Sequence, residues 1–169
     1  MIDPEKVLNF LKDRRTIRNF EDKEIPDDAI KMILEAGRWS PSASNRQPWE
    51  FVVIKNKELL KKLWDTKAVF SPSFQTAPLA IVIVGKINES PNWYETDLVL
   101  ASMNIMLMAW ALKLGTCWIG SMNRKKSKKI LNLEENDFIL TILPLGYVKD
   151  GIPNPPPRKE LSQITREIS

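Results

Sequence analysis

The sequence predicts an α+β domain with a central, mostly antiparallel sheet flanked by helices. Two observations favour this class: helix-like and strand-like segments alternate along the chain, and links such as that between residues 131 and 138 are too short for regular parallel crossovers. The length of 169 residues suits one hydrophobic core, so residues 1–169 are interpreted as a single domain.

Two helices are predicted in the first 41 residues. Asp3 and Pro4 form a favourable start for a helix, and the apolar residues after them share one face, so this helix should run to about Lys12. The second helix is expected in "PDDAIKMILEAGRWS", which has acids in its first turn and apolar residues at helical spacing. Pro41 follows its end.

The next segment has the pattern of two buried strands with a helix between them. "EFVVIK" (50–55) and "LAIVIVG" (79–85) are β-branched runs bounded by breakers, which is typical of core strands. "KELLKKLW" between them has the pattern of a short helix, and "SPSFQTAP" (71–78) is predicted to be a loop.

The second half of the chain begins with a helix over residues 95–114 that is apolar around most of its circumference. Such a helix is buried on several sides, which in a small protein indicates a subunit interface with a second copy. A turn, a short strand and a second turn are expected in "GTCWIGSM" (115–122), followed by a surface helix in "NRKKSKKILNL". "FILTILPLGYV" (138–148) is predicted to be a strand interrupted by Pro144, and the proline-rich tail after it should be extended.

Composition excludes several classes of function. The chain has no histidine, which removes Ser-His-Asp and Cys-His catalysis and every metal site that needs imidazole, so no metal is expected. The six glycines form neither GxGxxG nor GxxxxGK[ST]. Any phosphate must therefore be held by side chains.

The chain shows no sign of secretion or membrane insertion. Its N-terminus is charged rather than apolar, and the longest apolar run (98–112) is too short to span a bilayer. Cys117 is the single cysteine and cannot form an internal disulfide. We expect a cytoplasmic protein without a membrane partner.

Two basic segments are candidates for binding an anion. In an extended "RRTIR", Arg14, Thr16 and Arg18 would point to one side and line one groove. Arg158 and Lys159, on the proline-stiffened tail, could close on the same anion. Both segments can equally be solvated basic surface.

The stretch "PSASNRQPWEF" (41–51) concentrates neutral hydrogen-bonding groups directly before a predicted strand. Its Ser and Asn residues could perform ordinary turn and cap duties. The density of donors and acceptors beside Trp39, Trp49 and Phe51 instead favours a planar ligand with donor and acceptor edges. The residues alone leave both interpretations open.

Taken together, these motifs resemble the nitroreductase-like flavoproteins. The resemblance is carried, in order along nearly the whole chain, by "RRTIRNF", "AGRWSPSASNRQPWEFVVI", "APLAIVIV", "LASMNIMLMAWALKLGTCWIG", "LPLGYV" and "PPPRKEL". It implies an intertwined homodimer with FMN at the interface. It also implies hydride transfer from NADH or NADPH through the flavin to nitroaromatics, quinones or similar electron-poor small molecules.

The resemblance also assigns roles to residues. It implies that the flavin carries the chemistry, with no catalytic side chain. It implies that the phosphate and ribityl chain are bound by Arg14, Arg15 and Thr16, with Arg158 also at the phosphate, and that the pyrimidine end is bound by Arg18. It further implies that the ring is lined by Trp118, Ile119 and Gly120, and from the other subunit by Pro41, Ser42 and Ala43 with Asn45 and Gln47 nearby. Lys159 is left unassigned. Thr16 departs from the family pattern, in which serine is commonest, and the chain lacks the longer helical excursion that shapes substrate pockets in larger members.

A flavin-binding sensor or carrier without turnover would use the same contacts, and reductive dehalogenation or flavin destruction would need lid elements that the sequence lacks. Nucleic-acid binding is not expected, because the net charge is only +4 and "RKKSKK" (124–129) has the pattern of a solvated helical face.

Overall fold

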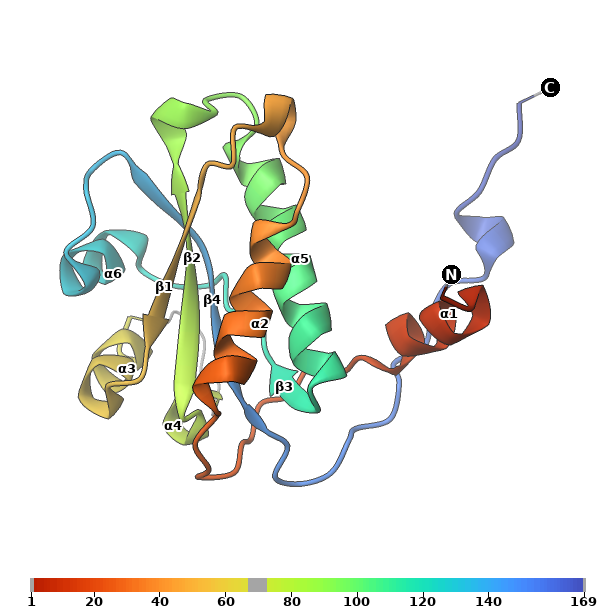
Figure 1. The fold of residues 1–169 in the computed structure, drawn as a ribbon, viewed down its shortest axis with the longest axis horizontal. Coiled ribbons are helices and arrows are strands. Elements are labelled where there is room, and N and C mark those ends of the chain that lie inside the picture. Colours follow the sequence, from red (N-terminus) through yellow and green to blue (C-terminus); the bar gives the residue numbers. More distant parts are fainter. Residues whose placement is uncertain (1, 67–72, 169) are drawn as a thin grey trace.

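The computed structural model describes residues 2–66 and 73–168, and its centre is a four-stranded sheet (Figure 1). The strands are β1 (Trp49–Ile54), β2 (Leu79–Lys86), β3 (Leu114–Thr116) and β4 (Asp137–Tyr147). Their order across the sheet is β1-β2-β4-β3, and every neighbouring pair is antiparallel. The predicted α+β class with a central antiparallel sheet is confirmed.

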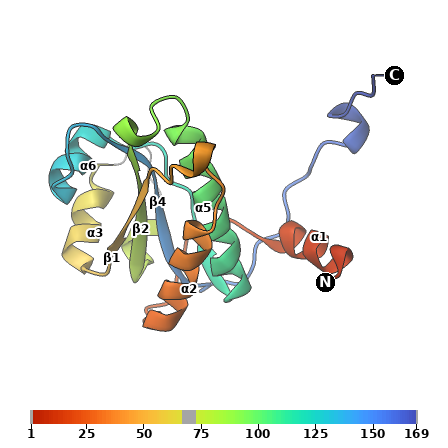
Figure 2. The ribbon, with the colours of Figure 1, turned by 45° about the horizontal axis from the view of Figure 1, so that its top comes forward.

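Helices cover both faces of the sheet (Figures 1 and 2). Their bounds are α1 (Pro4–Asp13), α2 (Asp27–Arg38), α3 (Lys57–Trp64), α4 (Ser73–Thr76), α5 (Tyr94–Ala111) and α6 (Arg124–Leu131). One face packs against α2 and α5, and the other packs against α3 and α6. The sheet therefore separates two hydrophobic cores.

Strand β2 shows how the sequence builds both cores. Ile81 and Ile83 belong to the core beneath α2 and α5, whereas Val82 and Val84 belong to the core beneath α3 and α6. Because successive side chains of a strand point to opposite faces, a strand covered on both faces must be apolar at every position. The continuous run "LAIVIVG" meets that requirement.

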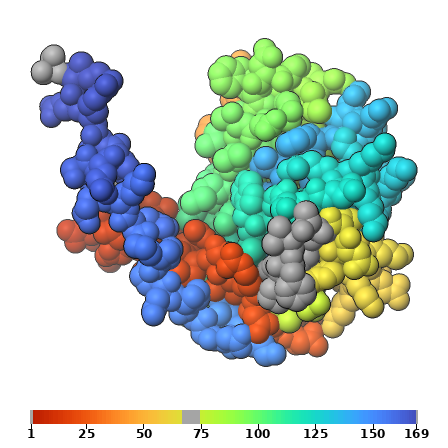
Figure 3. Space-filling view, turned by 180° about the vertical axis from the view of Figure 1, so that it is seen from behind, coloured from red at the N-terminus to blue at the C-terminus, as the bar shows by residue number. Residues whose placement is uncertain are grey.

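Helix α1 and the C-terminal tail project from this body (Figures 1 and 3). No residue of α1 is buried. Both segments nevertheless carry apolar side chains that are 45–79% exposed, namely Leu8, Leu11, Leu161, Ile164 and Ile168. Exposed apolar side chains of this kind are typical of a protein–protein contact.

Helix α5 has a second uncovered apolar face. Val99, Leu100 and Met103 are 40–44% exposed and lie within one turn of each other. In Figure 1, α1 and the tail project on the side of α5 that is turned away from the sheet. The uncovered surfaces of α5, α1 and the tail therefore lie on the same side of the molecule.

The predicted loop over residues 71–78 was partly wrong, because Ser73–Thr76 form the short helix α4. Residues 71 and 72 lie outside the described residues.

The prediction for the final strand was also wrong, since Pro144 lies inside β4 without interrupting it. Ile142 donates to Ile119, so the nitrogen of Pro144, two residues on, faces the same side. Pro144 is opposite Cys117, between the β3 ladder and the Ile119 bridge, so no ladder hydrogen bond is lost.

The predicted helix over 95–114 ends three residues early, at Ala111. Lys113 has a left-handed backbone (φ 61°), and β3 begins at the next residue. Gly115 is therefore a strand residue rather than a turn residue. A Cβ there would lie 2.5 Å from the side chain of Ile17, so only glycine lets Ile17 pack this closely against the backbone of β3.

Candidate functional site

The predicted phosphate-binding segment lies along β3. Thr16 forms a parallel bridge with Thr116, and the Ile17 N–H donates to the Thr116 carbonyl at 2.9 Å. The close contact at Gly115 allows this approach. Residues 14–18 thus lie beside the strand that leads into Trp118–Gly120.

Arg14 is a half-buried cation with an unsatisfied donor. Its Nη1 atom is buried and has no hydrogen-bond partner within the described part of the chain. Burial lowers the pKa of Arg14 below its ordinary value, and the positive charges of Arg158 and then Arg15 lower it further. Arginines from both ends of the chain are therefore close enough to repel one another, and an anion would relieve that repulsion.

Arg15 differs from Arg14 because its guanidinium is already engaged. Its Nε donates to the Pro153 carbonyl at 3.1 Å, and its Nη1 donates to the carbonyls of Lys12 and Arg14. Arg15 thus ties the start of the C-terminal tail to the end of α1. This contact helps to hold the two ends of the chain together near Arg14.

Thr16 and Arg18 also line a cleft of about 310 Å³ between residues 16–19 and 148–153. Arg18 is exposed, and its guanidinium forms no hydrogen bond or ion pair with any residue that the structure describes. Two larger hollows, of about 550 and 680 Å³, lie elsewhere on the described surface, and none of the predicted cofactor-binding residues lines them.

The segment Trp118–Gly120 is fixed to the sheet through its middle residue. Ile119 exchanges two backbone hydrogen bonds of 3.1 Å with Ile142. The buried hydroxyl of Thr141 accepts from the Ile119 N–H at 3.2 Å and lies 3.1 Å from the Ile119 carbonyl. The side chain of Trp118 is 39% exposed, so it is available to a ligand. Sequence reasoning missed Thr141, because a single threonine inside an apolar strand carries no local signal.

The loop at residues 40–47 holds an unusual backbone. Ser44, Asn45 and Gln47 all have positive φ, between 52° and 56°, a region that non-glycine residues rarely adopt. The Ser42 hydroxyl accepts from the Gln47 N–H at 2.9 Å and closes the turn. Ser42 therefore stabilises a turn, which is one of the two interpretations that the sequence left open for this stretch. The side chains of Asn45 and Gln47 are exposed.

Two polar residues of α5 hold this loop. Asp97 is 3% exposed and accepts from the Ala43 N–H at 3.0 Å, and Asn104 Nδ2 donates to the Ser40 hydroxyl at 2.8 Å. Sequence reasoning missed both, since isolated polar residues in an apolar helix do not reveal what they contact.

The residue before the loop is an exposed tryptophan with a fixed orientation. Trp39 is 73% exposed, and its indole N–H donates to Glu35 at 2.8 Å. Glu35 also accepts two hydrogen bonds from Arg38, which lies over the Trp39 ring. The hydrogen bonds from Arg38 and then Trp39 lower the pKa of Glu35 to about 2.

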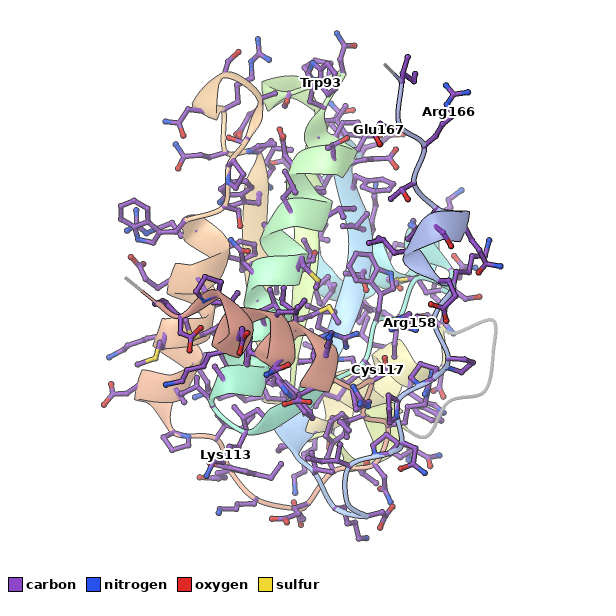
Figure 4. All side chains as sticks on the ribbon, turned by 90° about the vertical axis from the view of Figure 1, so that its right-hand side faces the viewer. Trp93, Lys113, Cys117, Arg158, Arg166 and Glu167 are labelled. Atoms are coloured by element: carbon purple, nitrogen blue, oxygen red, sulfur yellow. The ribbon has the colours of Figure 1, made fainter. Side chains whose placement is uncertain are left out.

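Within one chain the loop and the arginine cluster do not meet. Ala43 contacts Asp97 in the first turn of α5 and Ser40 contacts Asn104 in its middle, whereas Arg14–Arg18 contact β3, which follows the end of α5. Figure 4 shows Trp93 and Lys113 at opposite ends of this helix, with Cys117 and Arg158 nearer the Lys113 end. The helix from Asp97, which holds Ala43, to its end at Ala111 is about 21 Å long. Pro41–Ala43 and Arg14 therefore lie far apart within one chain.

Neither a metal cluster nor a membrane-spanning helix is present in the described ranges. No group of three or more Asp, Glu or Cys side chains is arranged to hold a metal ion there. No helix among these residues is long and apolar enough to cross a bilayer.

Comparison with known proteins gives one consistent family. The sequence profile of the Nitroreductase family matches residues 11–69 and 65–147. A protein of Archaeoglobus fulgidus named "Putative NADH dehydrogenase/NAD(P)H nitroreductase" is 35% identical over 153 residues, which cover 86% of this chain and 87% of that one. An iodotyrosine deiodinase of Nematostella vectensis is 26% identical over 190 aligned positions, covering 91% and 72% of the two chains. The solved structure of an FMN-dependent nitroreductase from Clostridium difficile R20291 superposes with a TM-score of 0.86 at 27% identity, covering 95% and 98%.

Proposed function

Because the chain belongs to the nitroreductase family of oxidoreductases, we propose that it binds FMN and transfers hydride from NADH or NADPH to small electron-poor acceptors such as nitroaromatics or quinones. The observation that carries the proposal is the buried, unpaired Nη1 of Arg14 beside the charges of Arg158 and Arg15. A terminal phosphate would supply the missing acceptor and neutralise the cluster.

The residues present fit a mononucleotide. Arg14 and Arg158 would hold the phosphate, Thr16 would lie by the ribityl chain, and Arg18 would keep a fixed positive charge at the pyrimidine edge of the ring. A backbone without a glycine-rich phosphate cradle requires such side chains. Bound FMN supplies the two-electron chemistry, so no protein acid or base is needed.

We also propose that the functional unit is a homodimer. The loop at Pro41–Ala43, with Asn45 and Gln47, would complete the cofactor site of the other subunit, since it lies at the opposite end of α5 from its own chain's arginines. The uncovered apolar faces of α5, α1 and the tail support a large contact with a second copy. Two cofactor sites per dimer follow from this arrangement.

The test is a visible spectrum of the purified protein, followed by anaerobic titration with each nicotinamide. We expect flavin absorption, release of FMN rather than FAD on denaturation, and loss of the flavin colour on addition of NADH or NADPH. A colourless protein that does not take up added FMN would contradict cofactor binding. Flavin that binds but is reduced by neither nicotinamide would instead support a sensor or carrier.

A further inference from the structure

We propose that Asp97 is a positioning residue for the flavin: it holds the loop at residues 40–47 in the shape that contacts the cofactor of the partner subunit. This inference rests on the proposed function and deepens it. The carboxylate of Asp97 belongs to α5 and does not face the arginine cluster of its own chain. Its effect on the cofactor therefore passes through the loop.

The surroundings of Asp97 are unusual for a carboxylate. The residue is 3% exposed, yet no Lys or Arg forms an ion pair with it in the described part of the structure. Its two oxygens instead accept from the Ala43 N–H at 3.0 Å and from the Ser90 hydroxyl at 3.2 Å. Ser90 is itself fully buried. The position near the N-terminus of α5 also favours a negative charge.

The bond to Ala43 is placed where the loop most needs support. Of the four residues that follow Ala43, three have positive φ: Ser44, Asn45 and Gln47. Non-glycine residues in this region persist only where their surroundings hold them there. Asp97 fixes the backbone directly before this strained stretch, and Asn104 fixes Ser40 on the other side of Ala43.

These contacts also limit what the loop can offer a flavin. The Ala43 N–H is used by Asp97, and the Ser42 hydroxyl already accepts from Gln47. The exposed side chain of Asn45 remains to contact the ring edge, as does that of Gln47, of which one Nε2 hydrogen already donates to the Asn45 carbonyl at 3.2 Å. Their positions depend on the backbone that Asp97 fixes. Loss of Asp97 should therefore weaken binding of the ring without changing the contribution of the phosphate.

The experiment compares Asp97→Ala with Asp97→Asn and with Ser102→Ala as a matched control. Ser102 is also buried in α5, but its hydroxyl donates to the Leu98 carbonyl and does not touch the loop. Dissociation constants of FMN and riboflavin are measured by flavin fluorescence on the dimeric apoprotein. We expect D97A to weaken both ligands about 10-fold or more, and equally, because the charge-assisted hydrogen bond that holds the Ala43 N–H is lost together with the one from Ser90. Asp97→Asn retains an acceptor for Ala43 and should remain within about threefold of the wild type.

Trypsin cleavage after Arg46 reports the loop without any flavin. Arg46 is exposed within the loop, and we expect D97A, but not S102A, to be cut there several times faster than the wild type. If D97A does not fold, Ser90→Ala removes only the second bond to Asp97 and should weaken both ligands about threefold. Unchanged flavin affinity in a D97A protein with faster cleavage would overturn the proposal, and so would equal loss in D97A and D97N. A wild type that binds no flavin would refute the proposed function, while unchanged cleavage in D97A would refute the role of Asp97 in the loop.

Discussion

Replacement of Arg14 by methionine tests the proposed anion site most directly. Methionine keeps much of the apolar stem of the side chain and removes the guanidinium. A hydrogen bond to a charged partner contributes about 1.5–3 kcal/mol, which corresponds to about 10- to 150-fold in a dissociation constant. We therefore expect R14M to weaken FMN by about that factor. Riboflavin lacks the phosphate, so its affinity should stay within about twofold.

The same variant should not destabilise the apoprotein. Burial and the charges of Arg158 and Arg15 lower the pKa of Arg14, so the folded state disfavours its charged form. The free-energy cost of holding the charged guanidinium in the folded state is present at every pH below the lowered pKa. It is relieved only when the pH rises through that pKa. At neutral pH the cation opposes folding, and apo R14M should unfold at the same temperature as the wild type or higher.

The assay is fluorescence titration of both flavins, with thermal unfolding of the apoproteins. Arg166→Met is the matched control, because Arg166 is exposed on the tail and the substitution makes the same change in charge (Figure 4). Inorganic phosphate should raise the unfolding temperature of the apo wild type and of R166M, but not of R14M. Equal losses of FMN and riboflavin affinity in R14M, or no loss of either, would refute the reasoning.

Three further outcomes are expected. Met103→Lys places a charge on the uncovered face of α5 and should raise the dimer dissociation constant at least tenfold by light scattering, whereas Met32→Lys, at a similarly exposed position on α2, should leave a dimer. Gly37→Ala would bring a Cβ within 2.8 Å of Ile105 and should cost about 1–3 kcal/mol in urea unfolding, so a cost below about 0.5 kcal/mol would contradict the packing between α2 and α5. Because the pKa of Glu35 is lowered to about 2, its contribution to stability is present above its usual value near 4.5 and is lost as pH falls toward 2. The difference in unfolding temperature between wild type and E35Q should shrink over that interval, and a constant difference would contradict it.

The sequence predicted best those elements whose local pattern agrees with their tertiary surroundings. Strands β1 and β2 and helix α3 are bounded by breakers and have uniform periodicity, and their predicted ends agree with the structure within one residue. Errors arose where a residue served a distant contact instead of a local turn. Gly115 allows Ile17 to approach, and Pro144 lies where the neighbouring ladder is broken, and neither condition is visible in the sequence.

The candidate site could be predicted only in part for the same reason. The motif "RRTIR" indicated a basic groove, but the proximity of Arg158 to Arg14 depends on a tail contact made by Arg15 across 138 residues. Asp97 and Thr141 had no signal at all, because each acts by fixing the backbone of another segment. A single sequence identifies groups that could touch a ligand more readily than groups that hold them in place.

The length of α5 has a genetic consequence. In the proposed dimer one chain gives its arginines to one cofactor and its loop to the other, so each polypeptide serves both pockets with different parts. A mixed pair of chains, one defective at Arg14 and the other defective at Asp97, would contain one pocket with both lesions and one with neither. Two parents with weakened flavin binding could thus restore one intact pocket by complementation between alleles.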